Sequence, residues 1–558
     1  MTLFASLIFF CISAIFFALF TWSYPLISPD EPRYAETARE MLSQSNFIVP
    51  YLDAVPRLVK PVLFYWLEAL SFKAFGINEF AARLISILAG AGLVSLAFIF
   101  GSLNSVGIIT GIITMSSIGI FIAAKLSITD MLLNFLISAS LICFFVAYDQ
   151  TKYRISTENN NEHKISIWLL LAFVAMAFGI LTKGPIAILL PVAIISVFLF
   201  LQKHLSFFLR SFQIEIFLGI LILLAINLPW YFLVDYATNG AFSQTFFLSD
   251  NLSRFFKPHS SHGAPIWFYI PVIFAGLFPW SFFLIQSLMA QNNDSSYFSL
   301  KSEKQRQKQM SNFCLVWIII TFIFFSIAKT KLPTYILPIF LPLALLIARW
   351  WQARFVISKS HNSKNLGLFW GLVAFLITVV SFLFIYFSKI KQSLSVIEAN
   401  SLVLPVIIIC SIYIACTAIA LTSVFSKAKI SFIFFASANF LCLSFFTPLL
   451  IKPFAIYRDG EAKAFMQNLK DDEKLYSYAS HPSRFSFYGK RIVKKTSIKD
   501  LKELIKKDNQ EIYLVLFTKL LKQFETQTQN HAIQYTTVKQ NSVYTYVKIS
   551  KQELQYVL

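Results

Sequence analysis

Two short segments of the sequence combine carboxylates with other polar side chains, the residue types that acid–base and phosphate chemistry use. The first segment, residues 28–34, reads Ser-Pro-Asp-Glu-Pro-Arg-Tyr and contributes Asp30, Arg33 and Tyr34. In the second segment, Asp130 stands at the start of an apolar stretch, where a carboxylate at the edge of hydrocarbon is energetically costly. These residues are therefore candidates for a site that handles charge.

The first segment also has a purely structural interpretation. Ser28 would be a helix N-cap, with a proline at the first helical position and Glu31 as the returning partner of a capping box. That interpretation leaves Arg33 and Tyr34 without a role, so both remain candidates for binding. Asp130 has the same alternative, because aspartate is a favoured N-cap residue.

Arg57 and Lys60 precede residues 62–75, an apolar segment that is too short and too interrupted to cross a bilayer. We expect this segment to lie along the membrane interface, with Tyr65 and Trp66 at headgroup depth. Arg57 and Lys60 would then lie at the boundary between water and lipid, either as ordinary anchors or as part of a site.

Further polar residues occur in a second long loop, residues 235–265, and in the short turns between apolar stretches. His259 and His262 are three residues apart, which is weak evidence for a metal site. The other members of this group are Lys183, Asp250, Arg254, Lys257, Lys331 and Tyr335.

The composition indicates that these residues belong to a membrane protein. The chain has 558 residues, of which 57% are hydrophobic and only 14% charged, and its mean hydropathy is +0.65. Soluble proteins carry about 25% charged residues, so a soluble globular enzyme is excluded. The net charge of +20 indicates basic cytoplasmic loops and an anionic substrate, since no nucleic-acid motif accompanies it. All six cysteines lie in apolar stretches and are expected to be buried hydrophobic residues.

Apolar stretches of about 20 residues, the length that crosses a bilayer core, recur about thirteen times. The first, Leu3 to Trp22, has neither a basic start nor a cleavage site, so we expect an anchor and not a cleaved signal peptide. Lysine and arginine gather in alternate loops, which predicts a cytoplasmic N-terminus. An odd number of spans then places residues 452–558 on the outer face.

Residues 452–558 differ in composition, being polar, rich in lysine and free of cysteine. Alternating patterns predict strands over 474–479, 512–518 and 543–549, and a helix over 497–507. The predicted organisation is a transmembrane domain of residues 1–451, with long outer loops at 23–78 and 235–265, followed by a small soluble α/β domain at 452–558.

The candidate residues all fall on the same, outer side of the predicted membrane domain. A transporter would be expected to place ionisable groups near the bilayer midplane in broken helices, whereas the predicted spans are almost free of charge. This arrangement favours an enzyme that acts on lipid-borne anions at the membrane surface.

Six motifs, in order along residues 1–450, resemble those of the ArnT/PMT-like glycosyltransferases, enzymes of the GT-C fold that use polyprenyl-phosphate sugars. The motif at residues 331–338, Lys-Leu-Pro-Thr-Tyr-Ile-Leu-Pro, looks most like the bacterial aminoarabinose transferases of lipid A. The other five are residues 30–36, 60–66, 78–84, 181–185 and 278–281. The resemblance implies an α-helical polytopic membrane protein of the GT-C fold, with about thirteen transmembrane helices and a small periplasmic C-terminal α/β domain.

The resemblance also implies roles for individual residues. Asp30 matches the catalytic carboxylate of the family, and Asp130 matches a second acidic residue that faces the same cavity. The residues that match positions near the phosphate of the donor are Arg33, Tyr34, Lys60, Arg254 and Tyr335. Arg57 and Lys331 complete the expected substrate-binding set, because they belong to the basic residues gathered beside the two aspartates.

The expected cofactor is left open. In relatives the residue before the lysine is usually acidic and has been linked to a divalent cation, but here it is Val59. The later loop has Asp250-Asn251 where relatives often show Glu-His. A metal site is therefore not assigned, and the sugar specificity can differ from that of aminoarabinose transfer.

The sequence thus predicts an enzyme of the bacterial inner membrane that transfers a sugar, such as 4-amino-4-deoxy-L-arabinose, from undecaprenyl phosphate to a lipid A phosphate on the periplasmic face. The expected partners are this donor, lipid A or another outer-leaflet acceptor, and membrane lipids, without nucleic acid. The alternatives are transfer of another sugar such as a hexosamine, protein O-glycosylation, or a transporter without enzymatic activity.

Overall fold

A computed structural model describes residues 2–157, 165–252, 263–290, 301–356, 366–385, 396–424, 427–470, 473–478, 481–498, 500–501, 504, 512–530, 533–540 and 543–549. The chain forms two compact units. The first, called the membrane unit, comprises Met1–Thr21, Leu58–Phe64 and Arg83–Ile451. The second, called the sheet unit, comprises Trp22–Arg57, Tyr65–Ala82 and Lys452–Leu558.

The membrane unit is built from helices, because its sequence consists mainly of long apolar stretches without strand-like alternation. Its α-helices are α1 (Thr2–Ala18), most of α4 (Glu79–Ser102), α5 (Gly107–Ser116), α6 (Ile118–Ala124), α7 (Thr129–Thr157), α8 (Ile167–Lys183), α9 (Ile186–Leu201), α10 (Leu205–Ser211), α11 (Gln213–Ala237), α12 (Ala241–Ser243), α14 (Tyr269–Gly276), α15 (Leu284–Met289), α16 (Lys301–Ile327), α17 (Phe340–Val356), α18 (Leu366–Ile385), α20 (Val396–Ser423) and α21 (Ala428–Phe446). Shorter 3-10 and π segments are η1 (Gln244–Leu252), η2 (Ile266–Phe268), η3 (Trp280–Phe283), η6 (Pro333–Ile339) and η9 (Thr447–Ile451).

Many of these helices are suited to a bilayer. Within the described residues, seven helices are long and apolar enough to cross a membrane. Three further helix pairs are bent by 65°, 118° and 106° at a short break, which raises the number to ten if each pair forms one span. The predicted total of about thirteen spans therefore stays a prediction.

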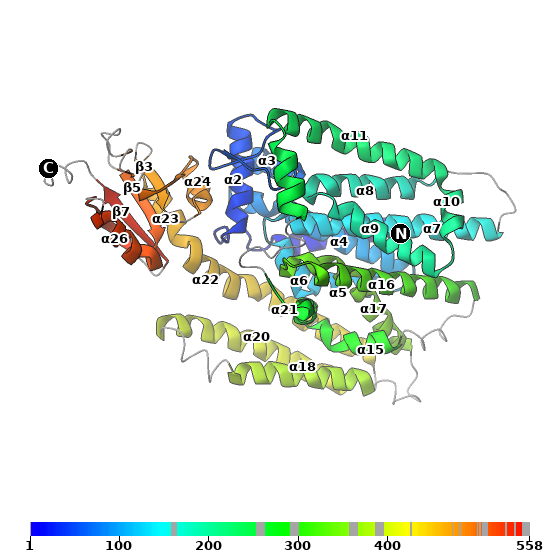
Figure 1. Ribbon diagram of the computed structural model, residues 1–558. Coiled ribbons are helices and arrows are strands. Elements are labelled where there is room, and N and C mark those ends of the chain that lie inside the picture. The colour runs from blue at the N-terminus through cyan, green and yellow to red at the C-terminus, as the bar shows by residue number, and fades with distance from the viewer. Residues whose placement is uncertain are drawn as a thin grey trace. The chain divides into compact units, whose positions relative to one another are not determined.

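Helices α7 and α11 occupy opposite environments within this unit. In its most apolar window α7 is 94% buried, and it packs against α8, α9 and η6. Helix α11 also packs on α8 (Figure 1), yet only 17% of its apolar window is buried. The apolar side chains of α11 therefore form a surface suited to lipid, whereas α7 is a central element that can hold polar side chains away from it.

The sheet unit contains two helices from the predicted loop 23–78 together with a mixed β-sheet (Figure 1). The early elements are α2 (Asp30–Ser43), the short hairpin β1 (Tyr51–Leu52) and β2 (Val55–Pro56), and most of α3 (Leu63–Phe75). The later elements are α22 (Lys452–Ala455), η10 (Ile456–Gly460), α23 (Glu461–Asn468), β3 (Lys474–Tyr478), α24 (Ser483–Gly489), β4 (Lys494–Thr496), β5 (Ile512–Phe517), η11 (Thr518–Leu520), α26 (Leu521–Asn530), β6 (Thr536–Gln540) and β7 (Tyr544–Ile549).

In the described residues the sheet has the strand order β4-β3-β5-β7-β6, parallel from β4 to β5 and antiparallel beyond. Alternation along β5 explains how both faces are covered. Leu514 and Leu516 pack with Phe524 of α26 on one face. Val515 packs on the other face with Met466 of α23 and Phe485 of α24.

The three strands predicted in the C-terminal part are confirmed as β3, β5 and β7. Most of the predicted helix over 497–507 lies outside the described residues. The apolar segment 62–75 forms the helix α3, and residues 30–43 of the same predicted loop form α2. Both helices contribute to one hydrophobic cluster, which also contains Phe487 of α24.

Candidate functional site

A cavity of about 450 Å³, called the membrane cavity, lies within the membrane unit. Apolar side chains of α7, α9, η1, α16 and η6 form much of its wall. The polar side chains that line it are Lys60, Asp130, Asn134, Lys183, Asp250, Thr330, Thr334 and Tyr335. A largely apolar wall with a few convergent charged groups is typical of a site for an amphiphilic ligand.

Asp130 and Lys183 form an ion pair in this cavity. Asp130 lies in the first turn of α7, and Lys183 is the last residue of α8. The distance from Lys183 Nζ to Asp130 Oδ1 is 2.6 Å, and both side chains are almost buried. The aspartate thus lies at a helix N-terminus and the lysine at a helix C-terminus, where each charge is favoured by the helix dipole.

Gly184 allows the chain to turn directly after Lys183. Its φ of +92° lies in the region that favours glycine, and a Cβ there would lie 2.5 Å from the Phe246 ring. Phe246 belongs to the π-helix η1, as does Asp250 one turn later. The close contact at Gly184 therefore brings η1 and Asp250 against the turn that carries Lys183.

Lys60 and Asp250 form a second ion pair of the same kind. Lys60 Nζ lies 2.8 Å from Asp250 Oδ2, and the two side chains are 14% and 5% exposed. The aromatic ring of Tyr335 lies beside the first pair, with its centroid 4.3 Å from Lys183 Nζ. The cavity thus holds two ammonium groups, each neutralised by a carboxylate.

Four other predicted site residues form a cluster in the sheet unit, called the α2 cluster: Asp30, Arg33, Tyr34 and Arg57, together with His481. The Arg33 guanidinium lies 3.6 Å from Asp30 Oδ1 and donates to the His481 ring at 2.9 Å. Arg57 lies over the ring of Tyr34, with 5.0 Å between Cζ and the ring centroid, and donates to the Arg33 carbonyl at 3.3 Å. The carboxyl-bearing side chain of Asp30 is 60% exposed, which leaves it accessible to a ligand.

His481 is a member of this cluster that sequence reasoning missed, because no motif surrounds it. Burial, together with the neighbouring charges of Arg33 and Arg484, lowers the pKa of His481 to about 4. The ring is therefore neutral near pH 7 and can accept the hydrogen bond from Arg33.

The predicted capping box at the start of α2 is wrong. The helix begins at Asp30, and the residue before it, Pro29, makes no side-chain capping bond. Glu31 instead accepts a hydrogen bond from the Ile27 amide at 2.7 Å, while the Ser28 amide donates to Asp459 at 3.0 Å. The Asp459 carboxylate, more than 400 residues away in the sequence, therefore accepts a backbone hydrogen bond next to the helix start, where a local capping residue was expected.

The two remaining predicted binding residues are Lys331 and Arg254. Lys331 is not among the described residues that line the membrane cavity, and its ammonium donates to the carbonyls of Ala264 at 3.1 Å and Ala328 at 2.7 Å. Arg254, like His259 and His262, lies outside the described residues.

No group of three or more metal-ligand side chains among the described residues lies around Lys60. Val59 has no ligand atom, and the Asp250 carboxylate is paired with Lys60. Among the described residues, one group has ligand atoms within 4.8 Å of one another: Glu36, Glu40 and Asp53. In that group Glu36 is bound by Arg39 through two hydrogen bonds, and Glu40 accepts the Asp53 and Ala54 amides. The carboxylates of Glu36 and Glu40 are therefore already bound by donors of the protein itself.

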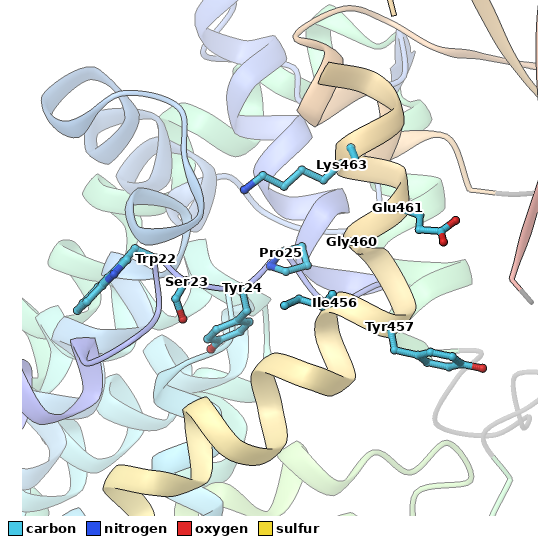
Figure 2. Close-up of a pocket in the computed structure, with 10 residues that line it drawn as sticks. Trp22, Ser23, Tyr24, Pro25, Ile456, Tyr457, Gly460, Glu461 and Lys463 are labelled. Atoms are coloured by element: carbon cyan, nitrogen blue, oxygen red, sulfur yellow. The ribbon is translucent and has the colours of Figure 1, made fainter. Parts of the chain in front are cut away.

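The sheet unit contains a hollow of its own, of about 520 Å³ (Figure 2). Its wall combines residues 22–25 with residues 456–464 and includes none of the predicted site residues. Lys463, at its edge, forms an ion pair of 2.5 Å with Glu79. Figure 2 shows Tyr457 and Glu461 pointing away from residues 22–25.

Comparison with known proteins supports the predicted relationship. The family model of dolichyl-phosphate-mannose-protein mannosyltransferase matches residues 1–240. The crystal structure of ArnT from Cupriavidus metallidurans bound to undecaprenyl phosphate has a TM-score of 0.78 over 97% of both chains, at 19% identity. Over residues 1–240 the chain is thus similar to this family of glycosyltransferases. It is a polytopic membrane protein of the GT-C fold, as the motifs predicted.

Two relatives show how far the sequence similarity extends. An undecaprenyl phosphate-alpha-4-amino-4-deoxy-L-arabinose arabinosyl transferase of Wigglesworthia glossinidia brevipalpis is 32% identical over 61% of this chain. A protein of the same name from Photorhabdus laumondii is 31% identical over 66% of it. These matches span 58% and 65% of the length of the two relatives. The similarity of sequence is therefore concentrated in one part of the chain, whereas the fold extends through nearly all of it.

Proposed function

We propose that this protein is a glycosyltransferase that moves a sugar from undecaprenyl phosphate to a phosphate of lipid A. The membrane cavity carries this proposal, since two lysine–aspartate pairs sit in a largely apolar wall. A polyprenyl chain matches the apolar side chains, and a phosphate matches the ammonium groups. The names of the relatives favour 4-amino-4-deoxy-L-arabinose as the sugar.

In this mechanism the carbon–oxygen bond between the sugar and the carrier phosphate breaks through a transition state with oxocarbenium character. The carrier phosphate is an acidic leaving group, so it needs positive charge and no general acid. Lys60 and Lys183 supply that charge when a phosphate oxygen replaces one carboxylate partner of each ammonium group. Tyr335 holds Lys183 through its ring face.

The acceptor phosphate of lipid A is already ionised, and its oxygen attacks the sugar without a base. We assign Asp30 to orienting the acceptor or stabilising the developing sugar cation, following its match to the catalytic carboxylate of the family. For a protein hydroxyl acceptor, the same aspartate would have to act as general base.

We further propose that the protein lies in the bacterial inner membrane, with a cytoplasmic N-terminus and a periplasmic domain at 452–558. Loops rich in lysine and arginine support this orientation. A cysteine placed in residues 452–558 should then react with an impermeant thiol reagent added to intact spheroplasts.

A second candidate function is protein O-glycosylation, which the family model for protein mannosyltransferases over residues 1–240 favours. Mass spectrometry of lipid A from cells with and without the gene separates the two candidates. We expect the loss of a sugar-sized mass from a lipid A phosphate when the gene is deleted, and the size of the loss identifies the sugar. Unchanged lipid A together with loss of sugar from membrane proteins would overturn the proposed acceptor.

A further inference from the structure

Asn134 is a polar residue of the membrane cavity that the proposed mechanism does not use. It lies on α7 four residues after Asp130, so both side chains are on one face of the helix. Asn134 lines the cavity and is only 1% exposed. A carboxamide in such a place has to find hydrogen-bond partners or lose free energy.

The partners that the chain itself supplies are incomplete. The Asn134 Oδ1 atom accepts from the Ser138 hydroxyl at 3.5 Å, a long contact. In the part of the chain that the structure describes, the buried Nδ2 group has no hydrogen-bond partner. The neighbouring cavity-lining residues of α7 are Leu133 and Ile137, whose side chains have no acceptor. Buried hydrogen-bond donors are paired in nearly all folded proteins, so an unpaired donor that faces a cavity points to a ligand as its partner.

The chemistry of the cavity indicates which part of a ligand this donor meets. A polyprenyl chain has no acceptor, and the phosphate is matched by the ammonium groups of Lys60 and Lys183. A neutral amide matches the remaining part, a sugar that carries neutral hydroxyl groups. We propose that Asn134 donates from Nδ2 to a hydroxyl oxygen of the donor's sugar and thereby helps to select that sugar.

This inference rests on the proposed function, and it assigns Asn134 to specificity and not to the reacting atoms. A site built to hydrogen-bond a hydroxyl binds poorly when either partner is missing. Asn134 should therefore affect the use of the sugar-bearing donor while leaving recognition of the lipid phosphate intact.

The test compares Asn134→Leu with Asn227→Leu in the full-length protein. Asn227 is a matched control, because it is a buried amide on α11 that is outside the cavity lining. Its Nδ2 group donates to the Leu223 carbonyl of its own helix at 2.9 Å. Two quantities are measured in each variant: kcat/KM for undecaprenyl-phosphate-linked 4-amino-4-deoxy-L-arabinose with lipid A, and the inhibition constant of undecaprenyl phosphate alone.

We expect Asn134→Leu to lower kcat/KM for the sugar donor about tenfold, the value of one buried hydrogen bond. Its inhibition constant for undecaprenyl phosphate should equal that of the wild type, which also verifies that the cavity is folded. Asn227→Leu should change neither quantity. If Asn134→Leu fails to insert, Asn134→Ala serves for the same comparison.

Three results would overturn the inference. An unchanged kcat/KM would mean that no ligand group meets Nδ2, and an equal loss for the donor and for undecaprenyl phosphate would assign the contact to the phosphate. An equal loss in Asn227→Leu would reveal a general effect of removing a buried amide. If the proposed function itself is wrong, the wild type will transfer no sugar from the donor. That result differs from the three above, and it would overturn the inference as well.

Discussion

The membrane cavity and the α2 cluster hold their cations in different ways. In the cavity, Lys60 and Lys183 are each bound to a carboxylate at under 3 Å. In the α2 cluster, Arg33 donates to a neutral histidine and lies 3.6 Å from the exposed Asp30 carboxylate, while Arg57 lies over an aromatic ring. An ammonium group is a compact charge that can exchange one anionic partner for another, whereas a stacked guanidinium is fixed in its plane. The ammonium groups of the cavity are therefore suited to exchange a carboxylate for a phosphate, whereas the guanidinium groups of the α2 cluster are held in place by their neighbours.

Asp30→Asn should have the largest effect, because the exposed carboxylate of the α2 cluster is assigned to the reacting sugar or to the acceptor. We expect transfer to be abolished while membrane insertion and the apparent affinity for undecaprenyl phosphate stay unchanged. Transfer is measured by sugar addition to lipid A in vesicles. Substantial retained activity would remove Asp30 from the mechanism and leave the cavity as the whole site.

Lys183→Met should destabilise the cavity strongly, since it leaves the Asp130 carboxylate nearly buried and without its cation. Removing one partner of a buried ion pair costs about 3–5 kcal/mol, which thermal unfolding in detergent can detect. The double variant Asp130→Asn with Lys183→Met should recover much of that loss, because no unpaired charge remains. Additive losses would show that the pair is not coupled.

Lys60→Ala should weaken donor binding, with a smaller effect on the maximal rate. A hydrogen bond to a charged group contributes about 1.5–3 kcal/mol, which corresponds to roughly a tenfold to hundredfold rise in apparent KM for the donor. Lys463→Ala, which breaks an ion pair in the sheet unit, provides the matched control. An unchanged KM in Lys60→Ala would contradict exchange of the Asp250 carboxylate for phosphate.

His481→Gln should have the smallest effect, visible only in the pH dependence of stability. The folded protein keeps His481 neutral down to about pH 4, while the unfolded chain takes up this proton near pH 6.5. The unfolded state thus binds more protons in this window, so stability falls as pH drops from about 6.5 to 4 and is unaffected by this group above it. The variant should lose that part of the dependence in melting curves at several pH values, and identical curves would contradict it.

The sequence predicted much of the fold for physical reasons that are local. Long apolar stretches without alternation can only satisfy their backbone in lipid as helices, and alternating patterns near residues 475, 514 and 546 produced strands. Tertiary contacts decided the helix start at Asp30, where Asp459 binds the Ser28 amide in place of a local capping arrangement. Local sequence contains no signal for such a distant partner.

Of the residues that line the membrane cavity, the sequence singled out Lys60, Asp130 and Tyr335 but not their partners. Asp130 and Lys60 could be recognised because a charge beside apolar sequence is costly, and motif resemblance added Tyr335. Their pairing with Lys183 and Asp250 depends on how α7, α8 and η1 pack, with Gly184 allowing the close approach of Phe246. The ion pair of Asp130 with Lys183 had one signal in the sequence: a lysine at the end of an apolar stretch, on the same predicted side as Asp130.

By itself, the sequence determined that this is a polytopic membrane protein that resembles the ArnT/PMT-like family and has acidic and basic residues beside its spans. Hydrophobicity is a property of composition, and family motifs are short, so both can be recognised without coordinates. Only the tertiary structure decided that Lys331 binds backbone carbonyls and that Asn134 presents an unpartnered donor in the described part of the cavity. Hydrogen bonding and burial depend on neighbours that come from separate helices, and their positions are set by packing.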